Sequence, residues 1–525
     1  MVTSPRTRAV VALVAATAVV AAGVGALVLR SDPASTTSWG DPVGVLGPVD
    51  LPPGAGPFEV TRARYDLGDE VFLAPGFESK IELAAVVHHP TRLAAGPFPI
   101  VLFMHGYHFP CFSGADTIFA WPCPDGYEPL PHDAGYDYIA ERLASWGFIV
   151  ASVSANGLNV RSYHESDDTG IRERGELFEA HLDLWSRWND EGGSPFGRRF
   201  VGEVDLTHIG TMGHSRAGEG AIWHVLVDRE RPRPYGIDAV LAIAPTDLTG
   251  ATLGGVPFGV VIPTCDGDLD DLQGIRLFER ARDAVRGDLA PKHLVTMVGA
   301  NHKFFNSVWS PGSGFPDTFD DTIDTCSDPL TQEEQRRAGA SYVVSFFRRY
   351  VGGDEALDAV WTGQRPAAGA GPSPVLVTYH APDTPEHRLD IDRFVSRAVL
   401  RWANGEGSVR FELPVASRDV SGFDAFQFRI AVDPEASAND GIATQDLVVI
   451  LADGAGGRAE VAASEVGNDA LTMDTRMILN QVRFPLRSFL GVDLRDVRRV
   501  ILDLSATPAG EVQIADVAFT SGTAS

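Results

Sequence analysis

The stretch Ile209-Gly210-Thr211-Met212-Gly213-His214-Ser215-Arg216-Ala217-Gly218 decides the fold. Its first four residues are a run typical of a buried strand, and a serine between small residues follows where that strand ends. A serine held in a strained turn between a strand and a helix needs small neighbours, because bulk two positions before or after it would collide with the turn. Gly213 and Ala217 meet this need. The pattern therefore predicts Ser215 as a nucleophile.

Two later strand-like runs supply the other groups that a serine nucleophile requires. Residues 258–262 lead into Pro263-Thr264-Cys265-Asp266-Gly267-Asp268, and residues 293–298 lead into Gly299-Ala300-Asn301-His302. His302 is the predicted base, because the unperturbed pKa of histidine, about 6.5, lets it accept and return a proton near neutral pH. A carboxylate behind it would fix its tautomer and stabilise the imidazolium. Asp268 is the predicted acid, and Asp266 is the alternative.

The same aspartates also alternate in the manner of a calcium-binding loop. Asp271 stands where such a loop needs glycine, and Leu277 stands where it needs a bidentate glutamate. No two cysteines have the C-x-x-C spacing that is common in zinc sites. We therefore expect no metal and no cofactor.

An earlier strand-like run leads into a loop that could stabilise negative charge. Residues 99–104 are followed by His105-Gly106-Tyr107-His108. In a serine hydrolase, a backbone N–H of this loop and that of the residue after the nucleophile point at the developing oxyanion. Here these donors are the N–H groups of Tyr107 and Arg216. His105 and His214 are expected to be structural, because the base must follow the last strands.

Aromatic residues follow the strands that carry the oxyanion loop and the base. Loops at the carboxyl ends of parallel strands form the ligand-facing edge of such a sheet. Tyr107 and Trp121 are predicted to form a wall of the substrate site, and Phe109 lies in the same loop region. Phe304 and Phe305 either join that wall or pack inward and orient His302.

Residues from about 57 to 350 resemble secreted actinobacterial-type α/β-hydrolases related to cutinase-like and polyester-hydrolase esterases. The resemblance implies an α/β-hydrolase fold and a carboxylic ester hydrolase that forms an acyl-enzyme. It places the acid three residues beyond a small residue at the strand end, here Cys265, which favours Asp268. Gly213-His214-Ser215-Arg216 is also similar to glucuronoyl esterases, which usually carry a basic or amide residue where this chain has Glu219. The further matching strings are Met104-His105-Gly106, Trp121-Pro122-Cys123-Pro124, Gly135-Tyr136-Asp137-Tyr138-Ile139-Ala140, Ser152-Val153-Ser154-Ala155-Asn156-Gly157 and Gly299-Ala300-Asn301-His302-Lys303-Phe304-Phe305-Asn306.

The pattern around these motifs predicts an α/β catalytic domain over residues 57–362. Strand-like and helical segments alternate from the third strand onward, which favours a mostly parallel, doubly wound sheet. Helices are predicted over residues 137–146, 171–188 and 331–350, the last opened by a capping box. Strands are predicted at residues 60–65, 81–88, 99–104, 148–152, 209–212, 239–243, 259–262 and 294–298.

The N-terminal segment suits export. Residues 1–30 contain two arginines before an uncharged apolar run from residue 9 to residue 29, which fits a signal peptide or a signal anchor. Basic residues before the run favour an N-terminus kept inside and a catalytic body outside the membrane. Residues 31–56 are predicted to be a flexible stalk rich in Pro, Gly, Ser and Thr.

Cysteine content and charge agree with an extracellular protein, secreted or anchored. The four cysteines, Cys111, Cys123, Cys265 and Cys326, would pair in an oxidising compartment, and three pairings are formally possible. A Cys111–Cys123 bond would brace one wall of the site and leave Cys265 with Cys326. The net charge of −27 opposes binding to nucleic acid and to anionic lipid.

A second domain is predicted beyond a linker rich in proline and small residues at 363–374. Residues 375–525 carry short strand-like segments at turn-marked intervals, which favours an all-β sandwich. Residues 512–519 resemble the last strand of galactose-binding-like jelly-roll modules, so the domain either binds carbohydrate or serves as a packing domain. Its strands are predicted at residues 395–402, 409–413, 425–432, 447–451, 476–485, 500–504 and 512–519.

Two classes of function follow. The first is an extracellular serine esterase that uses Ser215, His302 and Asp268 on a small or polymeric ester; lipases and peptidases use the same groups. The second is a non-catalytic surface-binding protein on the same scaffold. In either case the N-terminal segment provides a possible attachment to the membrane.

Overall fold

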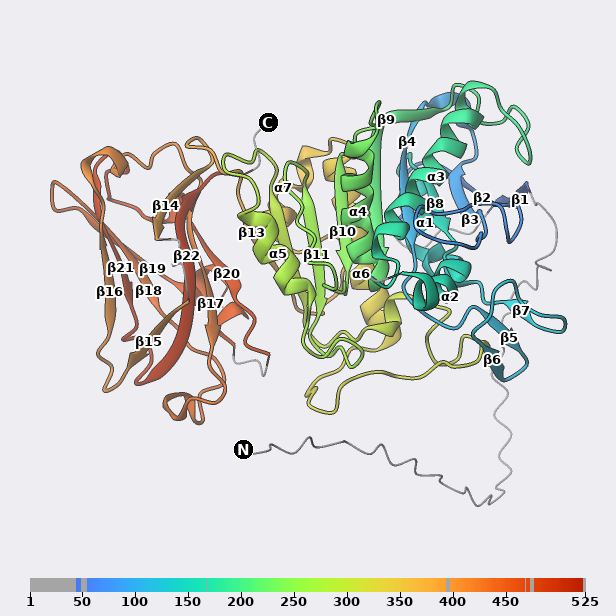
Figure 1. The fold of residues 1–525 in the computed structure, drawn as a ribbon. Coiled ribbons are helices and arrows are strands. Elements are labelled where there is room, and N and C mark those ends of the chain that lie inside the picture. Colours follow the sequence, from blue (N-terminus) through green and yellow to red (C-terminus); the bar gives the residue numbers. More distant parts are fainter. Residues whose placement is uncertain are drawn as a thin grey trace, which may run out of the picture. The chain divides into compact units, whose positions relative to one another are not determined.

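A computed structural model describes residues 44–48, 54–166, 168–392, 397–467, 469–472 and 476–522. The predicted signal peptide or anchor at residues 1–30, and most of the predicted stalk, lie outside these ranges. Within them, no helix combines the length and the apolar character needed to cross a membrane. The protein is a mixed α/β structure with one large mixed sheet and separate antiparallel sheets (Figure 1).

The large sheet has ten strands, and its central strands are parallel. The first three strands and the last strand run antiparallel to their neighbours. In spatial order the strands are β1 (Val45–Pro48), β2 (Val60–Asp66), β3 (Ala84–Pro90), β8 (Ile149–Val153), β4 (Phe98–Met104), β9 (Val204–His214), β10 (Ala239–Ile243), β11 (Phe258–Pro263), β12 (Lys292–Met297) and β13 (Val375–His380).

Helices cover both faces of this sheet, and the alternation of side chains along β4 explains why. Ile100, Leu102 and Met104 belong to a core shared with one set of helices, whereas Val101 and Phe103 belong to the core on the opposite face. The first core includes side chains of α3 (Ile171–Asp190), α4 (Arg216–Glu230) and α5 (Gly274–Arg282). The second includes side chains of α1 (Asp137–Ala144), α6 (Gln332–Tyr350) and α7 (Asp358–Trp361).

Two details of the helices agree with the sequence. Trp185 and Trp188 of α3 are buried, as their helical spacing predicts. The Thr331 side chain accepts a hydrogen bond from the Glu334 N–H, and the Glu334 side chain accepts one from the Thr331 N–H, so the predicted capping box opens α6.

The strand register brings the predicted motifs to one edge of the sheet. Met104 at the end of β4 pairs with Gly213 of β9, and Pro263 at the end of β11 pairs with Met297 of β12. Because these strands are parallel, their following loops emerge on the same side. The loops that begin at residues 105, 215, 264 and 298 therefore share that edge.

The sheet continues beyond the predicted linker. Strand β13 lies in the range predicted for the sandwich, but it pairs along its whole length with β12, from Lys292 opposite His380 to Met297 opposite Val375. Side-chain bonds also link it to β20 (Asn480–Pro485): the Tyr379 N–H donates to Gln481 Oε1 at 2.9 Å. The C-terminal segment thus contributes a strand to the large sheet.

The remaining C-terminal strands form two antiparallel sheets around a common core that includes Phe426, Phe428, Leu451 and Leu502. The first sheet contains β14 (Arg388–Asp392), β15 (Ala398–Trp402), β17 (Ala425–Val432), β20 and β22 (Gly510–Thr520). The second contains β16 (Ser408–Glu412), β18 (Val448–Asp453), β19 (Arg458–Ala462) and β21 (Val497–Asp503).

Two disulfide bonds join Cys111 to Cys123 and Cys265 to Cys326. The first closes a loop that contains β5 (Cys111–Ser113) and β6 (Asp116–Ile118), and these two strands form a small sheet with β7 (Glu128–Pro129). The second ties the loop after β11 to the segment before α6. The predicted use of cysteine in disulfides is confirmed.

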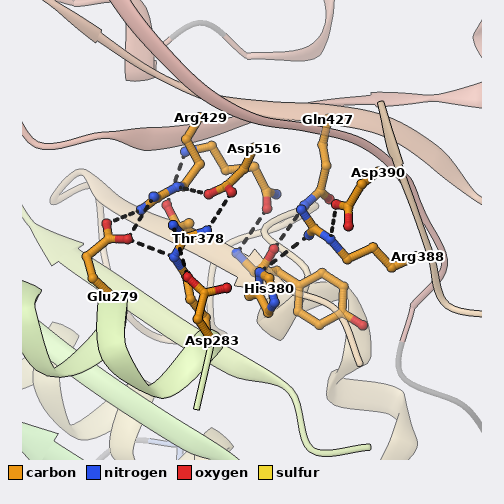
Figure 2. Close-up of polar contacts among 12 residues, drawn as sticks. Glu279, Asp283, Thr378, His380, Arg388, Asp390, Gln427, Arg429 and Asp516 are labelled. Carbon is orange, nitrogen blue, oxygen red and sulfur yellow. Dashed lines mark hydrogen bonds and ion pairs between the residues drawn. The ribbon is translucent and has the colours of Figure 1, made fainter. Parts of the chain in front are cut away.

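A cluster of charged side chains connects α5 with β17 and β22 (Figure 2). Arg429 donates to Asp516 at 2.5 Å and to Glu279 at 2.7 and 3.1 Å. Arg282 donates to Asp516 at 2.5 Å and to Glu279 at 2.7 Å. We call these four residues the arginine cluster. It attaches the helix that follows the Asp266 loop to the C-terminal strands.

Candidate active site

Ser215 lies in the turn between β9 and α4, where the sequence predicts a nucleophile. Its backbone has φ 58° and ψ −126°, a conformation that costs a non-glycine residue of order 1–3 kcal/mol. Hydrogen bonds hold the turn in place: the Ser215 N–H donates to Ile243 O at 2.9 Å, and the Gly218 N–H donates to Ser215 O at 2.8 Å. The surrounding strands therefore impose a strained backbone on this serine.

The small residues around Ser215 are required by close backbone packing. A Cβ atom on Gly213 would lie 1.8 Å from the carbonyl oxygen of Ala217, so only glycine fits there. A Cβ atom on Gly106 would lie 2.5 Å from the Cβ and 3.1 Å from the Oγ of Ser215. The backbone of the predicted oxyanion loop thus lies directly against the serine.

His302 and Asp266 form a buried pair in the loops after β12 and β11. Nδ1 of His302 lies 2.9 Å from Oδ2 of Asp266, and the two side chains are 2% and 1% exposed. The other carboxylate oxygen of Asp266 accepts the N–H groups of Asp268 and Leu269 at 2.9 and 2.7 Å. Both oxygens of Asp266 are therefore held, and one of them is aimed at the imidazole.

Asp268, which the sequence favours as the acid, lies on the other side of the imidazole. Its Oδ2 atom is 3.4 Å from Nε2 of His302, the ring nitrogen opposite Asp266, and its side chain is 58% exposed. The reason is the turn after β11: Asp266 accepts the backbone N–H groups of its own loop, which turns the chain outward by the time it reaches Asp268. The geometry thus places Asp266, the alternative, at Nδ1 of the imidazole and Asp268 at the opposite ring nitrogen.

The charges around His302 favour its protonated form. Burial opposes the imidazolium, but the carboxylates of Asp266, Asp268 and Asp321 outweigh it and raise the pKa of His302 to about 9. Asp321, which sequence reasoning did not single out, is itself buried, and that burial raises its pKa to about 6. It lies in an irregular segment before α6 that has no periodicity to mark it.

The loop after β4 is fixed by a buried histidine. Nε2 of His105 accepts the Ala155 N–H at 2.9 Å, so its Nδ1–H donates to Gly106 O at 2.8 Å. Asn159 donates to the same oxygen at 3.1 Å. Burial lowers the pKa of His105 to about 3, which keeps the ring neutral. His105 is a structural residue, as expected.

His214 is also enclosed by other side chains. Its Nδ1 lies 2.9 Å from the Tyr136 hydroxyl, and its ring centroid lies 4.8 Å from that of His302 and 4.9 Å from that of Trp309. Burial lowers the pKa of His214 well below its usual value, so it is a neutral neighbour of the base. This agrees with the structural role expected from the sequence.

The predicted oxyanion donors flank Ser215. Arg216 is the first residue of α4, where helical N–H groups have no intrahelical partner. Within the described ranges, neither the Tyr107 N–H nor the Arg216 N–H donates to another group of the protein. Glu219, one turn further along α4, is buried and accepts the N–H groups of Leu248 and Thr249. Its role in this structure is to hold the loop after β10.

The two residues predicted for the aromatic wall, Tyr107 and Trp121, differ in exposure. Tyr107 is partly exposed, and the Arg216 guanidinium lies over its ring at 3.8 Å from the centroid. Trp121 is buried beside Cys111 and Val160, and its Nε1–H donates to Asp69 O at 3.0 Å. An indole N–H that finds such an acceptor draws the ring inward. Trp121 is therefore part of a small core.

Other aromatic residues extend the exposed surface next to Tyr107. Phe119 lies 5.3 Å from Tyr107, 6.1 Å from Phe109 and 6.1 Å from Tyr163, measured between ring centroids. Phe109 and Tyr163 are exposed. Phe304 and Phe305 are buried, so the inward-packing alternative holds for this pair. Phe119 was missed because it follows a short strand of the disulfide-closed loop and not a strand of the large sheet.

Across the described ranges, no group of three or more His, Cys, Asp or Glu side chains is placed to hold a metal ion. Comparison of the chain with protein-family models and with curated proteins gives no match.

Proposed function

We propose that the protein is a serine hydrolase of α/β-hydrolase fold that cleaves carboxylic esters through Ser215, His302 and Asp266. The observation that carries the proposal is the strained backbone of Ser215 at the turn from β9 to α4. Strain of this kind persists only where the surrounding structure imposes it, and it gathers at functional sites. The buried His302–Asp266 pair at the same edge of the sheet supports the same conclusion.

The proposed mechanism assigns one role to each group. Ser215 Oγ attacks the ester carbonyl while Nε2 of neutral His302 accepts its proton. Asp266 holds the Nδ1–H and stabilises the imidazolium as it forms. The N–H groups of Tyr107 and Arg216 donate to the oxyanion. The imidazolium then protonates the leaving alcohol, and water releases the acid from the acyl-enzyme with His302 again acting as the base.

An extracellular location is part of the proposal. Disulfide bonds persist in oxidising compartments, and the two disulfides of this chain support export. The partly exposed ring of Tyr107 and the exposed rings of Phe109 and Tyr163 support an ester with a bulky apolar or aromatic group.

Active-site labelling tests the proposal. A fluorophosphonate probe should form a covalent adduct on Ser215 of the wild-type protein, identified by peptide mass spectrometry. Ser215→Ala should abolish the adduct and lower the hydrolysis of nitrophenyl esters by about 10⁴- to 10⁶-fold. Ser113→Ala, which changes an exposed serine of the disulfide-closed loop, is the matched control and should label normally. A correctly folded wild-type protein that never labels would be a non-catalytic binding protein.

A further inference from the structure

His302 has a carboxylate at each of its two ring nitrogens. Asp266 lies 2.9 Å from Nδ1, and Asp268 lies 3.4 Å from Nε2. A serine hydrolase needs only the first carboxylate, because Nε2 must accept the proton of the nucleophile. The second carboxylate therefore requires an explanation of its own.

The two carboxylates differ in how firmly they are held. Asp266 is almost fully buried and accepts two backbone N–H groups in addition to the imidazole. Asp268 is more than half exposed; its carboxylate forms an ion pair with His302 and interacts at longer range with the charges of Arg216 and Lys303. Asp268 can thus leave the imidazole at little cost, whereas Asp266 cannot.

The other charged groups near His302 do not cancel this pair. Asp321, from the segment before α6, adds a third carboxylate to the environment of the ring. His214, at the end of β9, is neutral because of its burial. The ammonium of Lys303 lies 3.1 Å from the ring centroid of Phe319. Arg216 is stacked on Tyr107. The imidazole therefore lies in a field dominated by carboxylates.

We propose that Asp268 is a positioning residue that restrains the base of the hydrolase proposed above: its carboxylate accepts the Nε2–H of protonated His302 and keeps that nitrogen from Ser215. The restraint ends when His302 loses this proton to solvent. The neutral imidazole no longer attracts the exposed Asp268 side chain, and Nε2 becomes free to accept the serine proton. The inference rests on the proposed function.

The sign of the pH effect follows from the form of the imidazole that acts. Neutral His302 is the active form, and its pKa is raised to about 9, so activity should increase with pH up to that region. Loss of the Asp268 charge should lower this pKa. Because Asp268 is exposed and screened by water, we expect a shift of about one pH unit, which makes the neutral form about tenfold more abundant at pH 7.

The test compares Asp268→Asn with Asp270→Asn, which removes the same charge from an exposed position two residues further along the loop. The second-order rate of labelling by a neutral fluorophosphonate is measured from pH 6 to pH 10. We expect Asp268→Asn to label about tenfold faster at pH 7 and to reach a plateau within threefold of wild type above pH 9.5. Asp270→Asn should follow the wild-type profile, and Asp268→Glu should restore it.

Several results would overturn the inference. One is a pH profile of Asp268→Asn that coincides with that of Asp270→Asn. Another is a plateau that falls more than 100-fold, which would make Asp268 the acid of the triad. Absence of labelling in wild-type protein at every pH would refute the proposed hydrolase. In that case a ¹H–¹⁵N titration of His302 in Ser215→Ala tests the contact between Asp268 and His302 by itself. A midpoint lowered by Asp268→Asn and not by Asp270→Asn would show that the contact exists without catalysis, and an unchanged midpoint would refute the contact.

Discussion

The arginine cluster and the proposed active site both bury carboxylates beside cations, but the cations differ. In the arginine cluster, two guanidinium groups face two carboxylates, and guanidinium stays charged at every pH that a protein survives. In the active site, the cation is an imidazolium that can lose its proton. The first arrangement suits permanent attachment, and the second suits a reaction in which a proton moves.

The pH response of the two regions should therefore be opposite. Burial alone would raise the pKa of Asp516, but the charges of Arg429 and Arg282 outweigh burial and lower that pKa. The contribution of Asp516 to stability is therefore present above the ordinary pKa of about 4 and is lost only as pH falls through the lowered pKa. The pKa of His302 is raised to about 9. Its contribution is complete below about 6.5 and is lost as pH rises to about 9. Between about pH 6.5 and pH 9, activity should therefore increase while the stabilisation from protonated His302 is lost. The stabilisation from the ion pairs of the arginine cluster should not change over the same range.

Asp266→Asn should have the largest effect of the variants that test this comparison. The asparagine can no longer stabilise the imidazolium or fix its tautomer, so we expect hydrolysis of a nitrophenyl ester to fall by about 10⁴-fold at pH 9. Steady-state kinetics measure the effect, and Asp270→Asn is the control. A loss below tenfold would remove Asp266 from the mechanism.

The assignment of the acid shows where sequence reasoning reaches its limit. The sequence could predict that the loops carrying Ser215, the two aspartates and His302 share one edge of the sheet, because parallel strands bring their carboxyl ends to one edge. The choice between Asp266 and Asp268 depends on the turn after β11, where Asp266 accepts the N–H groups of residues 268 and 269. Such a turn has no periodicity, so the sequence left both aspartates open.

Arg429→Met should have the next largest effect, on stability and not on chemistry. It leaves Arg282 as the remaining cation beside Asp516 and Glu279, and the loss of one partner from a buried ion pair costs up to about 3–5 kcal/mol. Urea unfolding, followed by tryptophan fluorescence, measures the change. Arg499→Met breaks an exposed pair between β21 and Glu412 of β16 and should cost less than about 1 kcal/mol. Equal costs for the two variants would refute the structural role assigned to the cluster.

The arginine cluster also explains a part of the fold that the sequence did not reveal. Composition and strand spacing predicted separate α/β and all-β regions, and the structure has both kinds of sheet. The sequence did not indicate that β13 would extend the large sheet, because an edge strand made by a distant segment leaves no local pattern. Nor could it pair Arg429 with Glu279, since charged residues that far apart carry no periodic signal.

Arg216 shows a third arrangement, in which the cation lies on the aromatic ring of Tyr107. Tyr107→Ala tests the role of this ring and should have the smallest effect of the variants. Loss of the ring removes apolar surface and the stacked guanidinium contact, together worth of order 1 kcal/mol at a partly exposed site. We expect KM for a bulky aryl ester to rise about fivefold, while KM for an acetyl ester of a small alcohol stays within twofold. Because the oxyanion donor at this position is the backbone N–H, kcat and the labelling of Ser215 should be nearly unchanged.

Phe319→Ala, which removes the ring beneath Lys303, is the matched control for a cation that loses its aromatic partner. A fall in kcat for both esters would mean that the ring holds the oxyanion loop itself, and equal KM values across a series of ester sizes would exclude Tyr107 from the substrate surface.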